Sequence, residues 1–247
     1  MNELLHVQSV SKRFGGVVAN ENISLRVNKG EIVGLIGPNG SGKTTLFNSI
    51  VGYHPIDGGS IRFAGKEISA LRVPEIARLG LLRTFQQTRI YPRMTCVENL
   101  VVSRPIPPLS LKAMFRRPSA AAAEEAAELL EFVGLYQKRH LRAGDLSFGQ
   151  QKLLEFAMAL INRPQMLLLD EPTAGINPTL INGLLERLHH ANERLQITLL
   201  VIEHNMRVIM TLAQRIYCLA HGQLLAEGTP DQIRQDPRVL DAYLGAR

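Results

Sequence analysis

The chain has 247 residues, which is enough for one large domain or two small ones. Hydrophobic residues make up 45% and charged residues 20%, which excludes a mostly disordered chain and predicts a packed core. Lysine and arginine outnumber acidic residues by 28 to 22, and this net charge of +6 fits a nucleotide, a nucleic acid or an anionic membrane surface.

The cysteines and the apolar runs restrict the surroundings of the chain. Cys96 and Cys218 lie far apart, without CxxC or metal-ligand spacing, so we expect a reducing compartment. The N-terminus carries no apolar signal core. The longest apolar runs, IVGLIG and ITLLVI, are shorter than the roughly 20 residues of a membrane span. We therefore expect any role at a membrane to come through a partner.

The pattern of apolar residues changes twice along the chain. Alternation in LLHVQSVSKRF and ISLRV predicts antiparallel strands, whereas the denser EIVGLIG predicts a buried strand that leads into a glycine-rich turn and a helix. From about residue 72 to 162 the pattern is mainly helical, with a proline-rich loop at 104–110. After 162, strands and helices alternate, which indicates parallel strands with crossover helices. The result is a mixed α/β core with a helical insertion.

The segment GPNGSGKTT (37–45) matches the phosphate-binding pattern GxxxxGK[ST]. Glycines let the backbone fold around phosphates, and the helix that follows adds its positive end. Lys43 would reach the β- and γ-phosphates, Thr44 would bind Mg²⁺ and Thr45 would contact the α-phosphate. A glycine turn without a ligand is the alternative, which the position between a buried strand and a helix disfavours. The predicted nucleotide-binding residues of this loop are Gly37, Pro38, Asn39, Gly40, Ser41, Gly42, Lys43, Thr44 and Thr45.

Other candidate residues stand at the ends of predicted strands. QMLLLDEP (165–172) ends in two carboxylates: Asp170 can hold Mg²⁺ or its waters, and Glu171 could polarise an attacking water. Adjacent acids at a strand end are often only a solvated loop, but the phosphate loop upstream favours function. Phe14 could stack on a nucleobase or belong to the core, and His204 could be a satisfied side chain or a γ-phosphate donor.

The segment DLSFGQQKLLEFAMAL (145–160) begins an apolar helix with a serine, a glycine and two glutamines. Serine is a favoured helix cap, and the start of a helix can also hold an anion. The residues alone do not say which anion binds there.

Together these segments resemble the ATP-binding cassettes of ABC transporters over essentially the whole chain. The motifs are GPNGSGKTT, the glutamine loop RTFQQ with Gln86, the signature LSFGQQ, LLLDEP and the histidine loop VIEHN, in the family's order. The resemblance implies an ABC ATPase fold, which is α/β with a P-loop mixed-sheet core, an N-terminal antiparallel β-subdomain and an inserted α-helical subdomain. We therefore expect one cassette over 1–247, with its core in 1–85 and 163–247 and the helical subdomain at about 86–162.

The resemblance also implies how the cassettes work. They act as head-to-tail pairs, and each ATP lies between the phosphate loop of one cassette and the signature of the other. Hydrolysis removes the γ-phosphate that both halves hold, and the pair opens. The residues expected to bind the partner's ATP are Leu146, Ser147, Phe148, Gly149 and Gln150.

For the chain's own nucleotide, the family implies specific roles. Phe14 would stack on adenine, Glu171 would be the catalytic base and His204 would contact the γ-phosphate. Gln86 would sense Mg²⁺ and couple the site to a membrane partner. ATP and Mg²⁺ are the expected cofactors, with Thr44, Gln86 and Asp170 around the metal.

Two positions depart from the commonest family pattern. The signature usually reads LSGGQ, whereas Phe148 replaces its first glycine, so this side chain must point away from the nucleotide. The loop after Glu171 often ends in Asp, whereas here it ends in Asn177, which keeps a hydrogen-bonding side chain without the charge. These departures concern the strength of coupling between the two cassettes of a pair, and not nucleotide binding.

Within the family, KLLEFAMAL, EPTAGINP, IEHNM and the ending GQLLAEGTPDQIRQDPRVLDAYLG look most like ATPases of branched-chain amino acid importers. The resemblance implies a peripheral protein at the cytoplasmic face of the inner membrane. Its partners would be integral membrane permeases, a second cassette (a different chain or a second copy) and, indirectly, a periplasmic or extracellular substrate-binding protein, with no nucleic acid. Arg89, Tyr91 and Arg93 are expected to help form the permease-docking groove.

Other classes remain as alternatives. Lipopolysaccharide-export and urea-import cassettes have similar sizes and endings. A soluble ABC ATPase acting on ribosomes or DNA is disfavoured because the chain has one cassette and no sustained heptads. A P-loop kinase would not need LSFGQQ or His204, and a non-enzymatic binding module would not need Glu171 beside Asp170.

Overall fold

The computed structural model describes residues 3–84, 90–104 and 120–244. The chain divides into two compact units. The first consists of Met1–Arg83, Gln165–Pro172 and Leu188–Arg247, and the second of Thr84–Pro164 and Thr173–Arg187. The segment 173–187, which the sequence analysis assigned to the core, thus groups with the helical unit.

The first unit contains an antiparallel sheet in the order β2-β1-β4-β5. Its strands are β1 (Glu3–Phe14), β2 (Val17–Asn28), β4 (Gly58–Phe63) and the short β5 (Lys66–Glu67). Burial alternates along much of β2, as the alternating sequence predicts for a sheet with one solvated face. The predicted antiparallel β-subdomain is confirmed.

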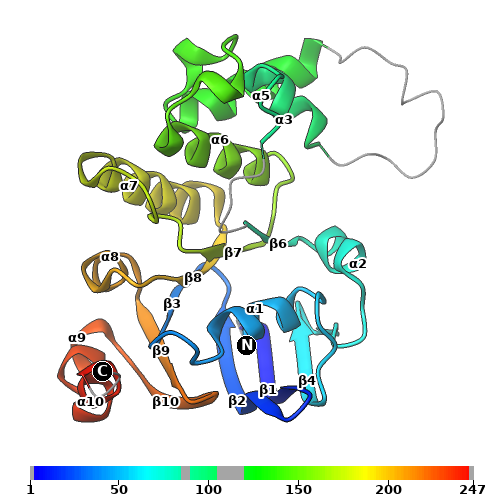
Figure 1. Ribbon diagram of the computed structural model, residues 1–247. Helices are drawn as coiled ribbons and strands as arrows, with labels where there is room; N and C mark the ends of the chain where they lie inside the picture. The colour runs from blue at the N-terminus through cyan, green and yellow to red at the C-terminus, as the bar shows by residue number, and fades with distance from the viewer. Residues whose placement is uncertain (1–2, 85–89, 105–119, 245–247) are drawn as a thin grey trace. The chain divides into compact units, whose positions relative to one another are not determined.

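The second sheet of this unit has the order β10-β9-β3-β8-β7-β6 (Figure 1). All neighbouring strands are parallel except β10 and β9. Every residue of the three central strands is buried, which explains their nearly unbroken apolar sequence. The strands are β3 (Ile32–Ile36), β6 (Leu81–Arg83), β7 (Met166–Asp170), β8 (Thr198–Ile202), β9 (Arg215–Ala220) and β10 (Gln223–Gly228).

The register of the central strands brings their carboxyl ends together. Ile202 of β8 pairs with Leu35 of β3 on one side and with Asp170 of β7 on the other. The residues that follow these strands therefore emerge at one edge of the sheet, the usual place for a ligand in an open α/β sheet.

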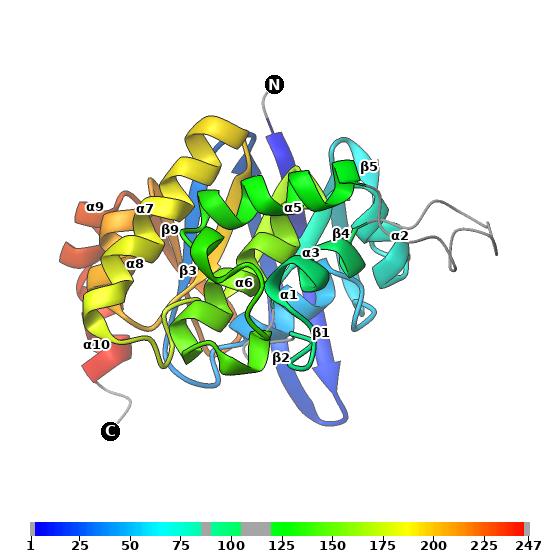
Figure 2. The same cartoon turned by 90° about the horizontal axis from the view of Figure 1, so that it is seen from above.

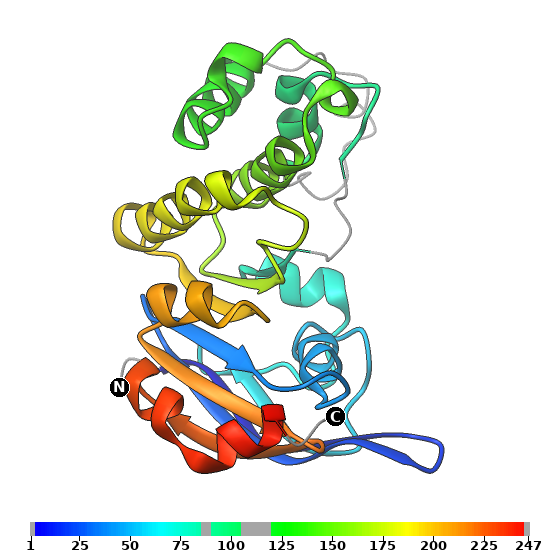
Figure 3. The same cartoon turned by 60° about the vertical axis from the view of Figure 1, so that its left-hand side comes forward.

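The first unit also contains helices, besides the end of α7 (Pro178–Leu195). They are α1 (Lys43–Ile50), α2 (Val73–Arg78), α8 (Met206–Leu212), α9 (Pro230–Gln235) and α10 (Pro237–Leu244). Leu46, Phe47 and Ile50 place one face of α1 in the hydrophobic core with strand residues such as Leu35. Helices α9 and α10 lie beside β9 and β10 at the C-terminal end of the chain (Figure 3).

The second unit is helical. Helices α3 (Cys96–Val102), α5 (Ala120–Phe132) and α6 (Phe148–Leu160) contact one another (Figure 2). Two 3₁₀ turns, Tyr136–Lys138 and Ala143–Asp145, stand before α6, and α7 (Pro178–Leu195) begins in this unit. The alanine-rich segment forms α5 as expected and buries one face through Ala122, Ala126 and Leu130, which are four residues apart.

Candidate nucleotide site

The loop between β3 and α1 has a backbone that only glycine allows. Gly37 has φ 147°, and a Cβ there would lie 2.1 Å from the carbonyl oxygen of Leu219. Gly42 has φ 97°, and a Cβ there would lie 2.3 Å from the carbonyl oxygen of Ala19. The loop therefore lies directly against the backbone of neighbouring strands, which fixes its curvature.

Contacts distant in sequence hold the second half of the loop. The Asn20 side chain donates from Nδ2 to the Gly42 carbonyl at 3.0 Å, and the Gly222 N–H donates to the Ser41 carbonyl at 3.2 Å. Asn20 and Ser41 are both buried. Sequence reasoning missed Asn20, because nothing in β2 indicates that this polar residue faces the loop.

The start of α1 has the chemistry of an anion site. Its N-cap residue is Gly42, which cannot cap with a side chain, and the first turn contains no acidic residue. The first N–H groups of a helix have no intrahelical acceptor, so those of Lys43, Thr44 and Thr45 are available to a ligand. Thr44 is exposed, as are Asn39 and Gly40 in the loop.

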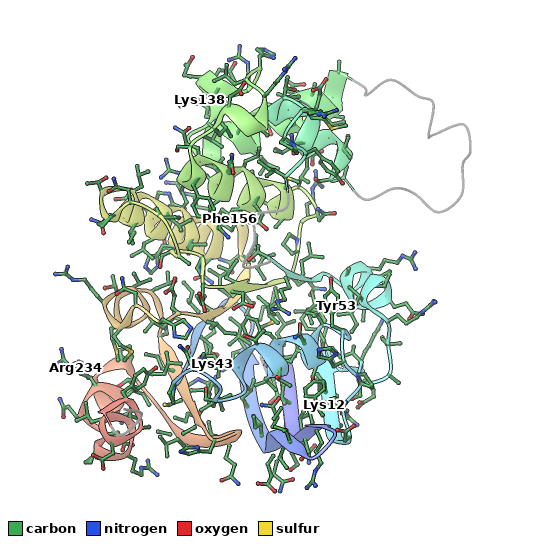
Figure 4. The ribbon with its side chains drawn as sticks, in the orientation of Figure 1. Lys12, Lys43, Tyr53, Lys138, Phe156 and Arg234 are labelled. Carbon is green, nitrogen blue, oxygen red and sulfur yellow. The ribbon has the colours of Figure 1, made fainter. Side chains whose placement is uncertain are left out.

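Lys43, labelled in Figure 4, folds back over the loop that precedes it. Its Nζ donates to the carbonyl oxygens of Gly37 at 2.7 Å and Pro38 at 2.9 Å. Burial lowers the pKa of Lys43, and the carboxylates of Glu171 and Asp170 oppose that shift. The ammonium group is thus held at the loop by neutral acceptors, which a phosphate oxygen could replace.

Asp170, the last residue of β7, is paired inside the site. Its Oδ2 lies 2.5 Å from Nη2 of Arg83, and both side chains are less than 10% exposed. The other terminal nitrogen of Arg83 donates to Oδ1 of Asn48 on α1 at 2.5 Å, and Cζ of the guanidinium lies 5.7 Å from the centroid of the Phe47 ring. Arg83 therefore connects the ends of β6 and β7 with α1.

Sequence reasoning missed Arg83, although it stands in the RTFQQ segment that was singled out for Gln86. Its signal is a basic residue at the end of a short strand, and its partner is 87 residues away in sequence. Only the pairing of β6 with β7 brings the two charges together. Gln86 and Arg89 lie outside the described residues.

Glu171 and His204 form a contact at the same sheet edge. Oε1 of Glu171 lies 2.7 Å from Nε2 of His204. Glu171 takes φ 50°, an unusual conformation for a residue with a side chain, and its N–H donates to the Ile202 carbonyl at 2.9 Å. This turn directs the chain out of β7 immediately after Asp170, so Glu171 does not continue the strand.

Phe14 ends β1 and is 45% exposed, so the alternative of a core phenylalanine is wrong. The ring of His54 meets it edge-on, with centroids 5.2 Å apart and an interplanar angle of 82°. Nζ of Lys12 lies 5.3 Å from the same ring. The exposed aromatic surface has the chemistry to stack on a base.

The signature residues lie in the second unit at the start of α6. Ser147 caps this helix as expected: its Oγ accepts from the Gln150 N–H at 3.4 Å, and its own N–H donates to Oε1 of Gln150 at 3.2 Å. Leu146 is buried, and a Cβ on Gly149 would meet the Leu180 side chain at 3.3 Å. Ser147 and Phe148 are exposed.

The two departures from the family pattern each have a local role in the second unit. The ring of Phe148 lies over Gly175, where a Cβ would come within 2.8 Å of ring carbon Cε1. Oδ1 of Asn177 accepts from the N–H of Thr179 at 3.0 Å and from its hydroxyl at 2.9 Å, at the start of α7. Phe148 thus covers the loop before α7, and Asn177 caps that helix.

The donor set fits magnesium bound together with a nucleotide. Over the described ranges, no three His, Cys, Asp or Glu side chains gather as a metal site. Mg²⁺ does not require such a cage, because it is usually held by one or two carboxylates, phosphate oxygens and waters. The hydroxyl of Thr44 and the carboxylate of Asp170 match that pattern.

In the same described residues, no helix has the length and apolar character of a membrane span.

Comparisons with known proteins agree with this site. A family model described as ABC transporter matches residues 20–174, and a model for the branched-chain amino acid ATP-binding cassette transporter matches 223–247. The chain is 41% identical to the high-affinity branched-chain amino acid transport ATP-binding protein BraF of Pseudomonas aeruginosa, over 98% of each chain. It is 40% identical to LivG of Escherichia coli K12, a protein of the same description, again over 98% of each.

Solved structures are similar over the full length. The ADP conformation of an ATP-binding cassette from an ABC transporter matches with a TM-score of 0.88 and 33% identity, over 99% of this chain and 100% of that one. A dimeric bacterial ABC transporter cassette matches with a TM-score of 0.77 and 25% identity, over 92% and 99%. The predicted fold is confirmed.

Proposed function

The chain belongs to the ABC transporter family, and on that premise we propose that it is the ATP-hydrolysing subunit of a membrane importer of branched-chain amino acids. The observation that carries this proposal is the meeting of the Lys43 loop, Asp170 and Glu171 at one edge of the parallel sheet. The relatives named for branched-chain amino acid transport, and the match of residues 223–247, support the substrate class.

Nucleotide binding is assigned to the phosphate loop and the start of α1. The N–H groups from Gly40 to Thr45 would surround the phosphates, while Lys43 would exchange the Gly37 and Pro38 carbonyls for phosphate oxygens. Phe14 would stack on adenine with its exposed face. The Mg²⁺ bound with ATP would neutralise phosphate charge, held by Thr44, Asp170 and Gln86, of which Gln86 lies outside the described residues.

Hydrolysis is assigned to Glu171 and His204. The Glu171 carboxylate would accept a proton from the attacking water, the step for which a positioned general base is needed. His204, already within 2.7 Å of this carboxylate, would orient it and donate to the γ-phosphate. Asp170 would not replace Glu171 as the base for the attacking water, because one of its carboxylate oxygens is paired with Arg83.

Pairing of two cassettes would complete the reaction. Ser147, Gly149 and Gln150 would bind the γ-phosphate of the partner's ATP, and Leu146 would anchor the segment from the interior. The dimeric form of a 25% identical cassette supports such pairing. The partners would be integral membrane permeases, a second cassette and, indirectly, an external substrate-binding protein. The chain would then be a peripheral subunit at the cytoplasmic face of the inner membrane.

The test is uptake of radiolabelled leucine by native cells that lack this gene. The wild-type gene should restore uptake, and Glu171→Gln, produced at the same level, should not. Urea uptake and surface lipopolysaccharide are measured in the same strains. Loss of either of these, with leucine uptake unchanged, would contradict the proposed substrate class and favour another ABC system.

Co-purification tests the assembly. Tagged Glu171→Gln chain, supplied with ATP and Mg²⁺ in gently solubilised membranes, should bring down two permeases and a second cassette. Recovery of ribosomal or DNA-bound proteins without membrane partners would overturn the transport proposal.

A further inference from the structure

We propose that Tyr243, in the C-terminal helix α10, is a positioning residue that holds the phosphate loop in the shape that binds nucleotide. The inference rests on the proposed nucleotide site and adds a residue that lies 206 positions from the loop in sequence. Tyr243 would not touch the nucleotide; it would act through Gly37.

The backbone N–H and carbonyl of Gly37 are hydrogen-bonded to the side chains of Tyr243 and Lys43, respectively. Its N–H donates to the Tyr243 hydroxyl at 2.8 Å, and its carbonyl accepts from Nζ of Lys43 at 2.7 Å. Gly37 itself is buried, with φ 147° and no room for a Cβ against Leu219. One residue therefore connects the C-terminal helix to the lysine that would bind phosphate.

A cavity lies beside this contact, between the phosphate loop and α10. It has a volume of about 450 Å³ and is lined by the loop on one side and α10 on the other. Its lining includes Pro38, Ser41, Arg238, Asp241 and Ala242. Because side chains do not fill this space, packing between α10 and the loop is incomplete there, and the Tyr243 hydrogen bond is a direct restraint between them.

Helix α10 is anchored independently of the loop. Val239 on α10 is buried, and the helix contacts α9 and β10. Burial raises the pKa of Tyr243 to about 12. Tyr243 therefore has a fixed base from which to hold Gly37.

Removing the hydroxyl should loosen the loop without unfolding the unit. When Lys43 turns toward phosphate it leaves the Gly37 carbonyl, and the Tyr243 hydrogen bond to the Gly37 N–H then remains. A loop that is not held in its binding shape must be ordered by the ligand, which weakens binding. Since one hydrogen bond contributes on the order of a five- to tenfold change in an equilibrium constant, we expect that loss for MgADP.

The experiment compares Tyr243→Phe with the wild-type full chain. The dissociation constant for MgADP is measured by calorimetry, and hydrogen exchange is measured in the peptide that contains Gly37. The expected result is a five- to tenfold weaker affinity and faster exchange in that peptide. Unchanged affinity and unchanged exchange would overturn the inference.

Tyr217→Phe is the matched control. Tyr217 is buried, whereas Tyr243 is half-buried, and the Tyr217 hydroxyl contacts the backbone of Arg26 and the side chain of Arg215, away from the phosphate loop. It should leave MgADP affinity and exchange at Gly37 unchanged. Equal losses in both variants would assign Tyr243 a merely structural role and overturn the inference. Failure of the wild-type chain to bind MgADP would instead contradict the proposed function.

Discussion

The start of α1 and the start of α6 are both candidate anion sites, but the chain completes them differently. At α1 the N-cap is glycine, no side chain caps the helix, and Lys43 lies folded over the loop. At α6 Ser147 and Gln150 satisfy each other in a capping box, and the lysine of this helix, Lys152, pairs with Glu155 at 3.7 Å. An anion at α6 must therefore compete with the helix cap, whereas at α1 it meets groups without an intrahelical partner.

This difference indicates why one region could bind nucleotide alone and the other would need a partner. The first is built from buried, distant contacts such as Asn20 with Gly42 and Tyr243 with Gly37. The second presents exposed Ser147 and Phe148 on a locally stabilised helix. A ligand already held by another chain would suit such a surface. The following variants test this comparison, from the largest expected effect to the smallest.

Glu171→Gln should separate binding from chemistry. The amide cannot accept the proton of water, so ATP hydrolysis should fall by a factor of about 10² to 10⁴. Phosphate release measures the rate, and calorimetry should give an MgADP affinity equal to that of the wild type. A wild-type rate in this variant would exclude Glu171 as the base.

Arg83→Met tests how much the stability of the first unit depends on the buried ion pair between Arg83 and Asp170. The change leaves Asp170 buried without its guanidinium, and loss of one partner of a buried pair costs about 3–5 kcal/mol. Urea unfolding measures this free energy. Arg62→Met is the control, because Arg62 and Glu67 form an exposed pair worth about 0–1 kcal/mol. Equal losses in the two variants would refute the role given to Arg83.

Lys43→Ala tests how much the lysine at the start of α1 contributes to nucleotide binding. Hydrogen bonds to charged groups contribute about 1.5–3 kcal/mol, so the dissociation constant for MgADP should rise about ten- to hundredfold. Lys66→Ala removes an exposed lysine in the same unit and should leave binding unchanged. If Lys43→Ala bound MgADP as tightly as the wild type, the phosphate-loop assignment would need revision.

Ser147→Ala should have the smallest effect and only on the second region. Loss of the cap should lower the free energy of unfolding by about 1 kcal/mol, and Ser147→Thr should restore most of it. Binding of MgADP to the isolated chain should not change, because the chain's own loop supplies that site. A clear loss of MgADP affinity would show that the two regions are not separate in this way.

Features that depend on neighbouring residues could be predicted from the sequence. The glycine loop, the Ser147 cap and the buried strands follow from rules that act over a few residues, and the order of the motifs identified the fold. Local chemistry also singled out Asp170, Glu171 and His204, because they stand at the ends of apolar strands. The position of Gln86 is outside the described residues, so its role stays a prediction.

Contacts between distant segments were decided only by the tertiary structure. Arg83 meets Asp170 because β6 pairs with β7, Asn20 meets Gly42 because β2 runs beside the loop, and Tyr243 meets Gly37 because α10 lies near the end of β3. A sequence specifies each strand's apolar pattern but not which strands become neighbours. The identity of the side chains that hold the site therefore depends on strand order, which arises from packing the whole unit.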